Sequence, residues 1–218
     1  MCTNIKISQM GLFTDVLGPG KRLVIWTQGC EKRCPGCMSP DKRDPMGGKS
    51  VSVDKLAEVI EKLSVKDSEL EGITISGGDP FFQSDKLHIF LTKIKTKTDL
   101  GVIIYTGYTM GELLAKNTPE INAIVGEGLG GTGKGLCDLI IEGEYVEELN
   151  DNSAMRGSSN QKLCFVTDRY KAFEDDYNKK ERNVEVLYQN NKDNLDMVVV
   201  GVPSKDTLEK IRNMGTKD

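Results

Sequence analysis

Three cysteines within eight residues are the group in this chain best suited to metal chemistry: Cys30, Cys34 and Cys37. Pro35 and Gly36 stand between the last two and predict a tight turn there. Thiolates are soft ligands, and closely spaced cysteines bind zinc or iron–sulfur clusters. A structural zinc site takes four ligands, yet no fourth Cys or His lies nearby, since the only histidine is His88. Three thiolates on a four-iron cluster would leave one iron open to a small-molecule ligand.

The cysteines follow one of several apolar segments that predict buried strands. These segments are Leu23 to Thr27, Gly72 to Ser76, Val102 to Tyr105 and Leu136 to Glu142. Apolar residues at helical spacing predict two helices. The first has Ser52 or Asp54 as its N-cap, and the second begins at Ser84. This alternation of strands and helices predicts an α/β protein with a parallel sheet.

Weaker patterns complete the expected order of elements. We expect strands at Thr3 to Gln9, Ile121 to Val125, Leu163 to Val166, Val184 to Tyr188 and Met197 to Gly201, and helices at Met110 to Lys116 and Thr207 to Met214. Tyr170 to Arg182 is highly charged and indicates a solvated helix or loop. The tail from residue 162 onward fits an extension of the sheet or packing against it, with a substrate or partner surface as the alternative.

Polar and glycine-rich motifs stand where successive strands are expected to end. Cys30 follows the first strand, Gly77 and Gly78 follow the next, and Thr106 follows the third. In α/β sheets, ligands bind beyond the carboxyl ends of the strands, so these motifs predict a single site. A glycine pair also allows backbone to approach a ligand where a Cβ would clash. An ordinary strand-ending turn is the alternative for the pair.

The C-x3-C-x2-C spacing resembles the radical S-adenosylmethionine (SAM) superfamily, and other motifs resemble its branch that activates anaerobic ribonucleotide reductases. The motifs that carry this narrower resemblance are residues 18–22 (GPGKR), 29–30 (GC), 34–37 (CPGC), 76–80 (SGGDP), 105–108 (YTGY), 138–143 (DLIIEG) and 156–161 (RGSSNQ). The resemblance covers about residues 1–170. It implies a partial (β/α) barrel of the radical SAM type over residues 1–170, with residues 171–218 as a short C-terminal α/β extension of the same globule.

The resemblance implies that Cys30, Cys34 and Cys37 hold a [4Fe-4S] cluster and that SAM chelates its open iron. The reduced cluster then passes one electron to the sulfonium, which yields methionine and a 5′-deoxyadenosyl radical. That radical takes hydrogen from a glycine of a partner, a glycyl-radical enzyme of the anaerobic ribonucleotide reductase type. A flavodoxin or ferredoxin is the expected reductant.

The resemblance also assigns roles at the SAM site. Gly77 and Gly78 hold the amino and carboxylate end of SAM, and Asp79 places a carboxylate near its ammonium. Many superfamily members have Glu at this position, whereas the reductase activators often have Asp. Thr106 and Tyr108 are candidates for contact with the ribose or adenine. Turn formation and packing are the alternative roles for these two residues.

Two further segments carry weaker signals. Residues 156–161 are rich in donors and can bind a carboxylate or a partner backbone, with Arg156 and Asn160 as the candidates; a polar surface turn is the alternative. Residues 128–135 nearly form a Walker A loop, but Gly135 stands where the Mg²⁺-binding hydroxyl should be. Because a strand is expected next rather than a helix, we interpret this segment as a flexible loop that closes over the site.

Composition narrows the classes of protein. The 218 residues fit one domain, and a net charge of −4 gives no electrostatic case for nucleic acid. No apolar run approaches the ~18 residues of a membrane span, and the N-terminus lacks a secretory pattern. Six cysteines without a signal indicate reduced thiols, hence a cytoplasmic protein. Cys2, Cys137 and Cys164 are interpreted as buried small apolar residues.

Two other functions remain open from the sequence. The chain could cleave SAM for a different substrate, such as a small metabolite or a ribosomally made peptide. The cysteines could also form a structural zinc or electron-transfer centre with no catalysis.

Overall fold

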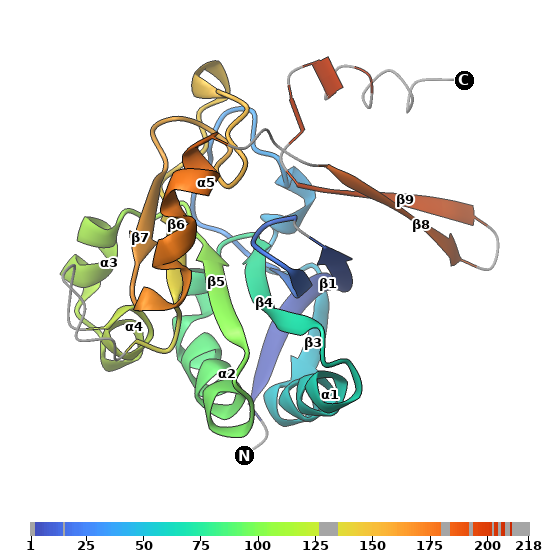
Figure 1. Cartoon of the computed structure of the whole chain (residues 1–218), viewed down its shortest axis with the longest axis vertical. Helices are drawn as coiled ribbons and strands as arrows, with labels where there is room; N and C mark the ends of the chain where they lie inside the picture. The colour runs from blue at the N-terminus through green and yellow to red at the C-terminus, as the bar shows by residue number, and fades with distance from the viewer. Residues whose placement is uncertain are drawn as a thin grey trace.

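The computed structural model describes residues 3–14, 16–126, 135–179, 184–191, 194–201, 203–204, 206–207 and 210. A seven-stranded mixed sheet in the order β3-β1-β2-β4-β5-β6-β7 runs through it (Figure 1). Its strands are β1 (Asn4–Thr14), β2 (Lys21–Thr27), β3 (Lys49–Ser52), β4 (Leu70–Gly77), β5 (Gly101–Tyr105), β6 (Leu139–Glu142) and β7 (Lys162–Phe165). The central strands β2, β4, β5 and β6 are parallel, which confirms the four buried strands expected from their apolar segments.

In the described part of the chain, the main elements between and after the strands are five α-helices and four short 3₁₀ segments. The helices are α1 (Val53–Lys66), α2 (Ser84–Lys97), α3 (Met110–Lys116), α4 (Pro119–Val125) and α5 (Glu174–Lys179), and the 3₁₀ segments are Pro40–Lys42, Pro80–Gln83, Glu147–Leu149 and Asp168–Phe173. Ser52 caps α1, because its side chain accepts a hydrogen bond from the Lys55 amide. Among these helices, none has both the length and the apolar character needed to cross a bilayer.

Apolar residues cover the central strands from both sides. Ile73 and Ile104 belong to a buried cluster that also contains side chains of α1, α2 and α4. On the other face of the sheet, Ile103 and Leu139 pack in a second buried cluster with Tyr170 and the α5 residue Tyr177. Because both faces are covered, the strands are apolar throughout rather than alternating.

The expected strand at Ile121 to Val125 is wrong, because these residues form the end of α4. Thr118 caps this helix by accepting a hydrogen bond from the Ile121 amide, and Pro119 occupies the first helical turn. The short apolar segment alone fits a strand or a helix, whereas the preceding Thr-Pro pair is the helix signal. The helix ends at Gly126, whose φ is +76°.

The main sheet is open, which matters for the barrel expected from the resemblance. The α/β class is confirmed, but the sheet is not closed, since β3 and β7 are its two edges. The barrel geometry that the resemblance implies therefore stays a prediction. The expected strand at Thr3 to Gln9 continues as β1 to Thr14, where it pairs antiparallel with β2.

The C-terminal part contains both expected strands, β8 (Glu185–Asn191) and β9 (Asn194–Val200), in a separate antiparallel pair. Within the tail after Gln161, β7 extends the main sheet as expected, whereas β8 and β9 form their own pair, which in Figure 1 projects beside β1. Val200 is nevertheless buried with Phe13 and Trp26 of the sheet. A boundary at residue 170 stays a prediction. Cys2, residues 127–134 of the glycine-rich loop and most of the expected helix at 207–214 lie outside the described residues.

Candidate functional site

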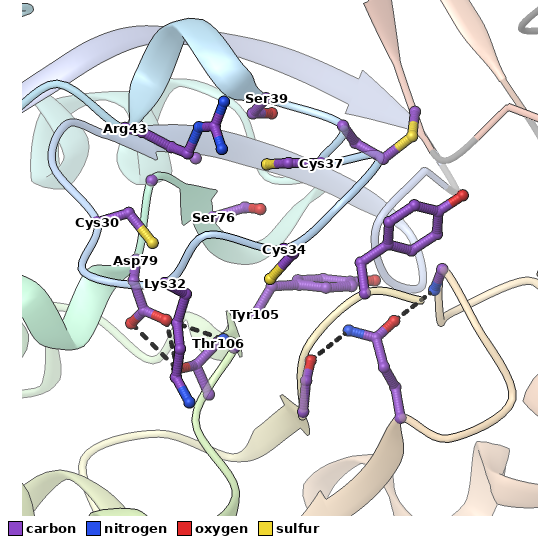
Figure 2. Close-up of a pocket in the computed structure, with 18 residues that line it drawn as sticks. Cys30, Lys32, Cys34, Cys37, Ser39, Arg43, Ser76, Asp79, Tyr105 and Thr106 are labelled. Atoms are coloured by element: carbon purple, nitrogen blue, oxygen red, sulfur yellow. Dashed lines mark hydrogen bonds between the residues drawn. The ribbon is translucent and has the colours of Figure 1, made fainter. Parts of the chain in front are cut away.

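A cavity lies at the carboxyl ends of β2, β4 and β5, where the sequence motifs were expected to meet. Its wall contains the three clustered cysteines and the strand-end residues that follow β4 and β5 (Figure 2). The sequence-predicted residues in the wall are Cys30, Cys34, Cys37, Gly77, Gly78, Asp79 and Thr106. The cleft, including its open mouth, encloses about 780 Å³.

The loop that carries the cysteines is fixed by its own backbone. The Cys30 amide donates to the Arg43 carbonyl at 3.1 Å, and the Cys37 amide donates to the Cys34 carbonyl at 3.3 Å. The side-chain amide of Gln28 spans the base of the loop by donating to the Asp44 carbonyl at 2.8 Å. These contacts hold the thiols at the cavity without any bound group.

The electrostatic surroundings of Cys34 and Cys30 favour the protonated form of these two thiols. Burial, followed by the Glu144 carboxylate, raises the pKa of Cys34 to about 11, and the Cys34 thiol donates to Glu144 Oε2 at 3.5 Å. Burial, followed by the charge of Asp79, also raises the pKa of Cys30. Metal binding at these thiols would therefore release protons, as it does at thiolate sites generally.

The donor set fits an iron–sulfur cluster. All three thiols border one cavity and are partly exposed rather than buried. Across the described residues, no three His, Cys, Asp or Glu side chains converge as the ligands of one metal ion do. A four-iron cluster differs from a single ion because each cysteine binds a different iron atom.

The other two described cysteines lie away from the cavity. Cys137 is 0% exposed and Cys164 is 8% exposed, and burial raises the pKa of both thiols. This confirms the interpretation of both as buried small residues.

The glycine pair after β4 is required by a close approach of two backbone segments. Gly77 has a φ of +108°, and a Cβ there would lie 2.5 Å from the Thr27 carbonyl oxygen. A Cβ on Gly78 would clash with the backbone of Gly29 and Lys42. The pair thus lets the end of β4 pass directly beneath the cysteine loop, and both glycines also border the cavity.

Asp79 is a buried carboxylate, 1% exposed, at the cavity wall. Its oxygens accept from the Phe81 amide at 3.0 Å, the Gly107 amide at 2.8 Å and the Thr106 hydroxyl at 2.9 Å. Burial raises its pKa to about 6. Three donors leave one of the four lone-pair positions of a carboxylate for a further donor.

Thr106 and Tyr108 have different positions relative to the cavity. Thr106 lies in the wall, but its hydroxyl is already used to hold Asp79. Tyr108 lies outside the wall: its hydroxyl donates to Glu31 at 2.6 Å, and the ammonium groups of Lys32 and Lys116 lie over its ring. The Thr106 hydroxyl thus holds Asp79, and the Tyr108 ring packs against Lys32 and Lys116. Contact of either residue with the ribose or adenine stays a prediction.

The segment after Tyr145 reaches the cavity through residues other than the two candidates. Arg156 pairs with Asp151 at 2.8 Å, and the Asn160 side chain donates to the Glu144 carbonyl at 2.8 Å. Neither lines the cavity, whereas Gly157 and Gln161 do. The Gln161 side chain closes this wall by accepting from the Gly157 amide and donating to the Gly143 carbonyl, each at 2.7 Å.

Several cavity residues received no site role from the sequence. Some of them stand within the motifs of the resemblance, namely Ser76, Tyr105, Gly107, Gly143, Gly157 and Gln161, and the others are Lys32, Met38, Ser39, Arg43 and Tyr145. The motifs therefore contained the signal for the first group, although no role was assigned to these residues. Lys32 and Arg43 had no such signal, since both lie in the irregular loop around the cysteines.

Comparison with known proteins gives matches over the region that contains the cavity. The family model described as "4Fe-4S single cluster domain" matches residues 16–164. Proteins named "Anaerobic ribonucleoside-triphosphate reductase-activating protein" are similar to this chain. The one from Enterobacteria phage T4 is 27% identical over 70% of this chain and 89% of its own length. The protein of that name from Escherichia coli K12 is 27% identical over 67% of this chain and 89% of its own length. The one from Haemophilus influenzae is 29% identical over 68% of this chain and 90% of its own length.

Proposed function

The chain belongs to the family of 4Fe-4S single cluster domains, and on that premise we propose that it activates an anaerobic ribonucleoside-triphosphate reductase by radical SAM chemistry. One observation carries the proposal: Cys30, Cys34 and Cys37 share a cavity wall with the Ser76–Asp79 strand end. The names of the similar proteins support the choice of partner.

The three thiols would hold the cluster and leave one iron open toward the cavity. A cluster bound at these thiols would supply the one electron needed to break a carbon–sulfur bond of SAM into methionine and a radical fragment that removes a hydrogen atom from a glycine Cα of the reductase. The chain's own part is to bind and orient SAM and to keep water away from the radical.

Asp79 would bind the ammonium of SAM through the acceptor position that its present hydrogen bonds leave open. Thr106 and the Gly107 amide fix the carboxylate, so its direction is set before the ligand arrives. The close passage of Gly77 and Gly78 beneath the cysteine loop keeps this end of the ligand beside the thiols. The cavity remains open on one side, which suits entry of a glycine-containing segment of the reductase.

The test is anaerobic reconstitution with iron and sulfide, reduction by dithionite, addition of SAM and chromatography for 5′-deoxyadenosine. We expect product from the wild type and none from a variant with Cys30, Cys34 and Cys37 all changed to Ala. Cys164→Ala is the matched control, because it removes a thiol outside the cavity. Bound zinc with no retained iron would refute the proposal.

The partner is tested by adding a candidate reductase and recording the electron paramagnetic resonance spectrum of a glycyl radical. A glycyl radical that depends on SAM and on the three cysteines supports reductase activation. SAM cleavage with no glycyl radical on any cognate reductase would instead favour a different substrate, such as a small metabolite or a peptide.

A further inference from the structure

Two basic side chains line the cavity, and they differ in whether a carboxylate neutralises them. Lys32 Nζ lies 2.9 Å from Glu112 Oε1 and 2.9 Å from Glu144 Oε1, so its charge is matched twice. The Arg43 guanidinium forms no ion pair with any described residue. Its Nε donates only to the Pro40 carbonyl, at 3.4 Å within its own turn. Arg43 is therefore the positive charge that the cavity wall leaves available.

The position of Arg43 is set by the turn that also presents the cysteines. Its carbonyl accepts from the Cys30 amide at 3.1 Å, and its amide donates to the Pro40 carbonyl at 3.3 Å. Figure 2 shows the guanidinium on the Ser39 side of the cavity, with Asp79 at the opposite end. In this view, the thiols have the buried Asp79 carboxylate on one side and the Arg43 guanidinium on the other.

This arrangement is complementary to the two charged ends of an α-amino acid. A carboxylate such as Asp79 accepts from an ammonium, and a guanidinium binds a carboxylate through two parallel hydrogen bonds. We propose that Arg43 binds the carboxylate of the methionine part of SAM, with Asp79 receiving its ammonium. The inference rests on the proposed function, and it assigns to Arg43 the role that the sequence gave to Arg156.

The geometry favours Arg43 over Arg156 for this role. Arg156 is ion-paired with Asp151 and does not line the cavity, so its charge is matched elsewhere. Arg43 lies on the cysteine loop itself, which places an anion receptor next to the thiols. A second role for the guanidinium, as a counter-charge to the cluster alone, makes a different prediction and is an outcome of the test.

The experiment measures anaerobic calorimetric binding of two probes to reconstituted protein: SAM and decarboxylated SAM, which lacks only the carboxylate. The variants are Arg43→Gln, which removes the charge, and Arg43→Lys, which keeps the charge but not the paired donors. Lys42→Gln is the matched control, because Lys42 lies in the same turn, pairs with Asp41 at 2.9 Å and is outside the cavity wall. Iron content is measured on every sample.

We expect Arg43→Gln to weaken SAM binding by about 10- to 100-fold, the usual loss for a charge-assisted hydrogen bond, and Arg43→Lys by less. Binding of decarboxylated SAM should change by less than about twofold in either variant, as should binding of both probes to Lys42→Gln. Equal weakening of both probes, or of neither, would overturn the assignment, and it is also overturned if Arg43→Gln and Arg43→Lys both lose iron. Failure of the iron-loaded wild type to bind SAM would contradict the proposed function itself, which is a separate result.

Discussion

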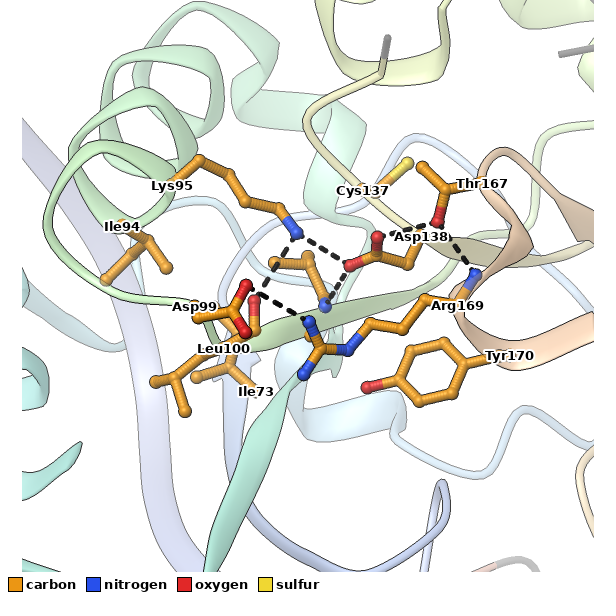
Figure 3. Close-up of polar contacts among 12 residues, drawn as sticks. Ile73, Ile94, Lys95, Asp99, Leu100, Cys137, Asp138, Thr167, Arg169 and Tyr170 are labelled. Carbon is orange, nitrogen blue, oxygen red and sulfur yellow. Dashed lines mark hydrogen bonds and ion pairs between the residues drawn. The ribbon is translucent and has the colours of Figure 1, made fainter. Parts of the chain in front are cut away.

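Two aspartates, buried at opposite ends of the parallel strands, are stabilised in different ways. Asp138 precedes β6 and is 4% exposed; its Oδ2 accepts from Lys95 Nζ and from the Val102 amide, each at 2.7 Å (Figure 3). Asp79 follows β4 and is 1% exposed, but no Lys or Arg of the described part of the chain forms an ion pair with it. Only neutral donors, such as the Thr106 hydroxyl and the Gly107 amide, hold its carboxylate.

The difference separates a structural end of the sheet from a ligand-binding end. At the Asp138 end, charges are matched within the protein: Arg169, for example, pairs with Asp99 at 3.4 Å (Figure 3) and with Glu71, also at 3.4 Å. At the cavity end, the negative charge of Asp79 and the positive charge of Arg43 are left without ionic partners. A buried charge without an ionic partner is costly, so the buried Asp79 carboxylate leads us to expect a charged ligand at this wall.

We expect the largest effect when a cysteine of the cavity and a cysteine of the core are each replaced by alanine. Replacing Cys34 with Ala should abolish iron retention and 5′-deoxyadenosine formation, because a cubane cluster cannot be held by the two remaining cysteines. Cys137→Ala should keep full iron content and lose about 1 kcal/mol of unfolding free energy, since it removes one buried sulfur atom. Iron analysis and chemical denaturation check the pair. Loss of iron in Cys137→Ala with folding intact would contradict the separation of the two ends.

The second prediction compares two variants in which Asp138 or Asp79 is replaced by asparagine. Asp138→Asn should lower the free energy of unfolding by about 3 to 5 kcal/mol, because Lys95 loses its buried partner. Asp79→Asn should cost about 1 to 2 kcal/mol, since an amide cannot accept at both of its atoms. The same variant should weaken SAM binding at least about tenfold. Urea denaturation and calorimetry measure both quantities, and a smaller stability loss in Asp138→Asn than in Asp79→Asn would reverse the comparison.

The sequence predicted the strand ends of the cavity because local patterns determine them. The apolar segments gave β2, β4, β5 and β6, and each motif after them reached the wall. Side-chain direction within irregular loops was not predictable in this way. Arg156 and Arg43 are both arginines in loops rich in turn residues, and only tertiary contacts decide that one meets Asp151 and the other the cavity.

The same limit applies to elements whose local signal is mixed. Ile121 to Val125 fits a strand by composition, but a helix was set by Thr118 and Pro119 before it. The short strand β3 follows the glycine pair at residues 47–48 and is stabilised by pairing with β1, a partner more than forty residues away in the chain. Long-range pairing of this kind leaves no pattern in the segment itself.

The third prediction compares the two threonines whose hydroxyls donate to the aspartates. Thr106→Val and Thr167→Val should each cost about 1.5 to 3 kcal/mol, because each removes a hydrogen bond to a buried carboxylate. Only Thr106→Val should weaken SAM binding, by about three- to tenfold, since Asp79 loses its fixed direction. Calorimetry on both variants decides the matter: equal SAM affinity in the two would show that Thr106 does not position Asp79 for the ligand.

The smallest effect is expected at Tyr108, which lies at the cavity end of the sheet but outside the cavity wall. Tyr108→Phe removes the hydrogen bond to Glu31, which is partly exposed, so the expected loss is about 1 kcal/mol of unfolding free energy. SAM affinity should stay within about twofold of the wild type, because the ring and its contacts with Lys32 and Lys116 remain. A larger loss of affinity, measured by the same calorimetry, would mean that Tyr108 contacts the ribose or adenine as the resemblance implies. The ligand site would then extend past the wall seen here, toward α3, and the ligand-binding end would include the Lys32 ion pairs.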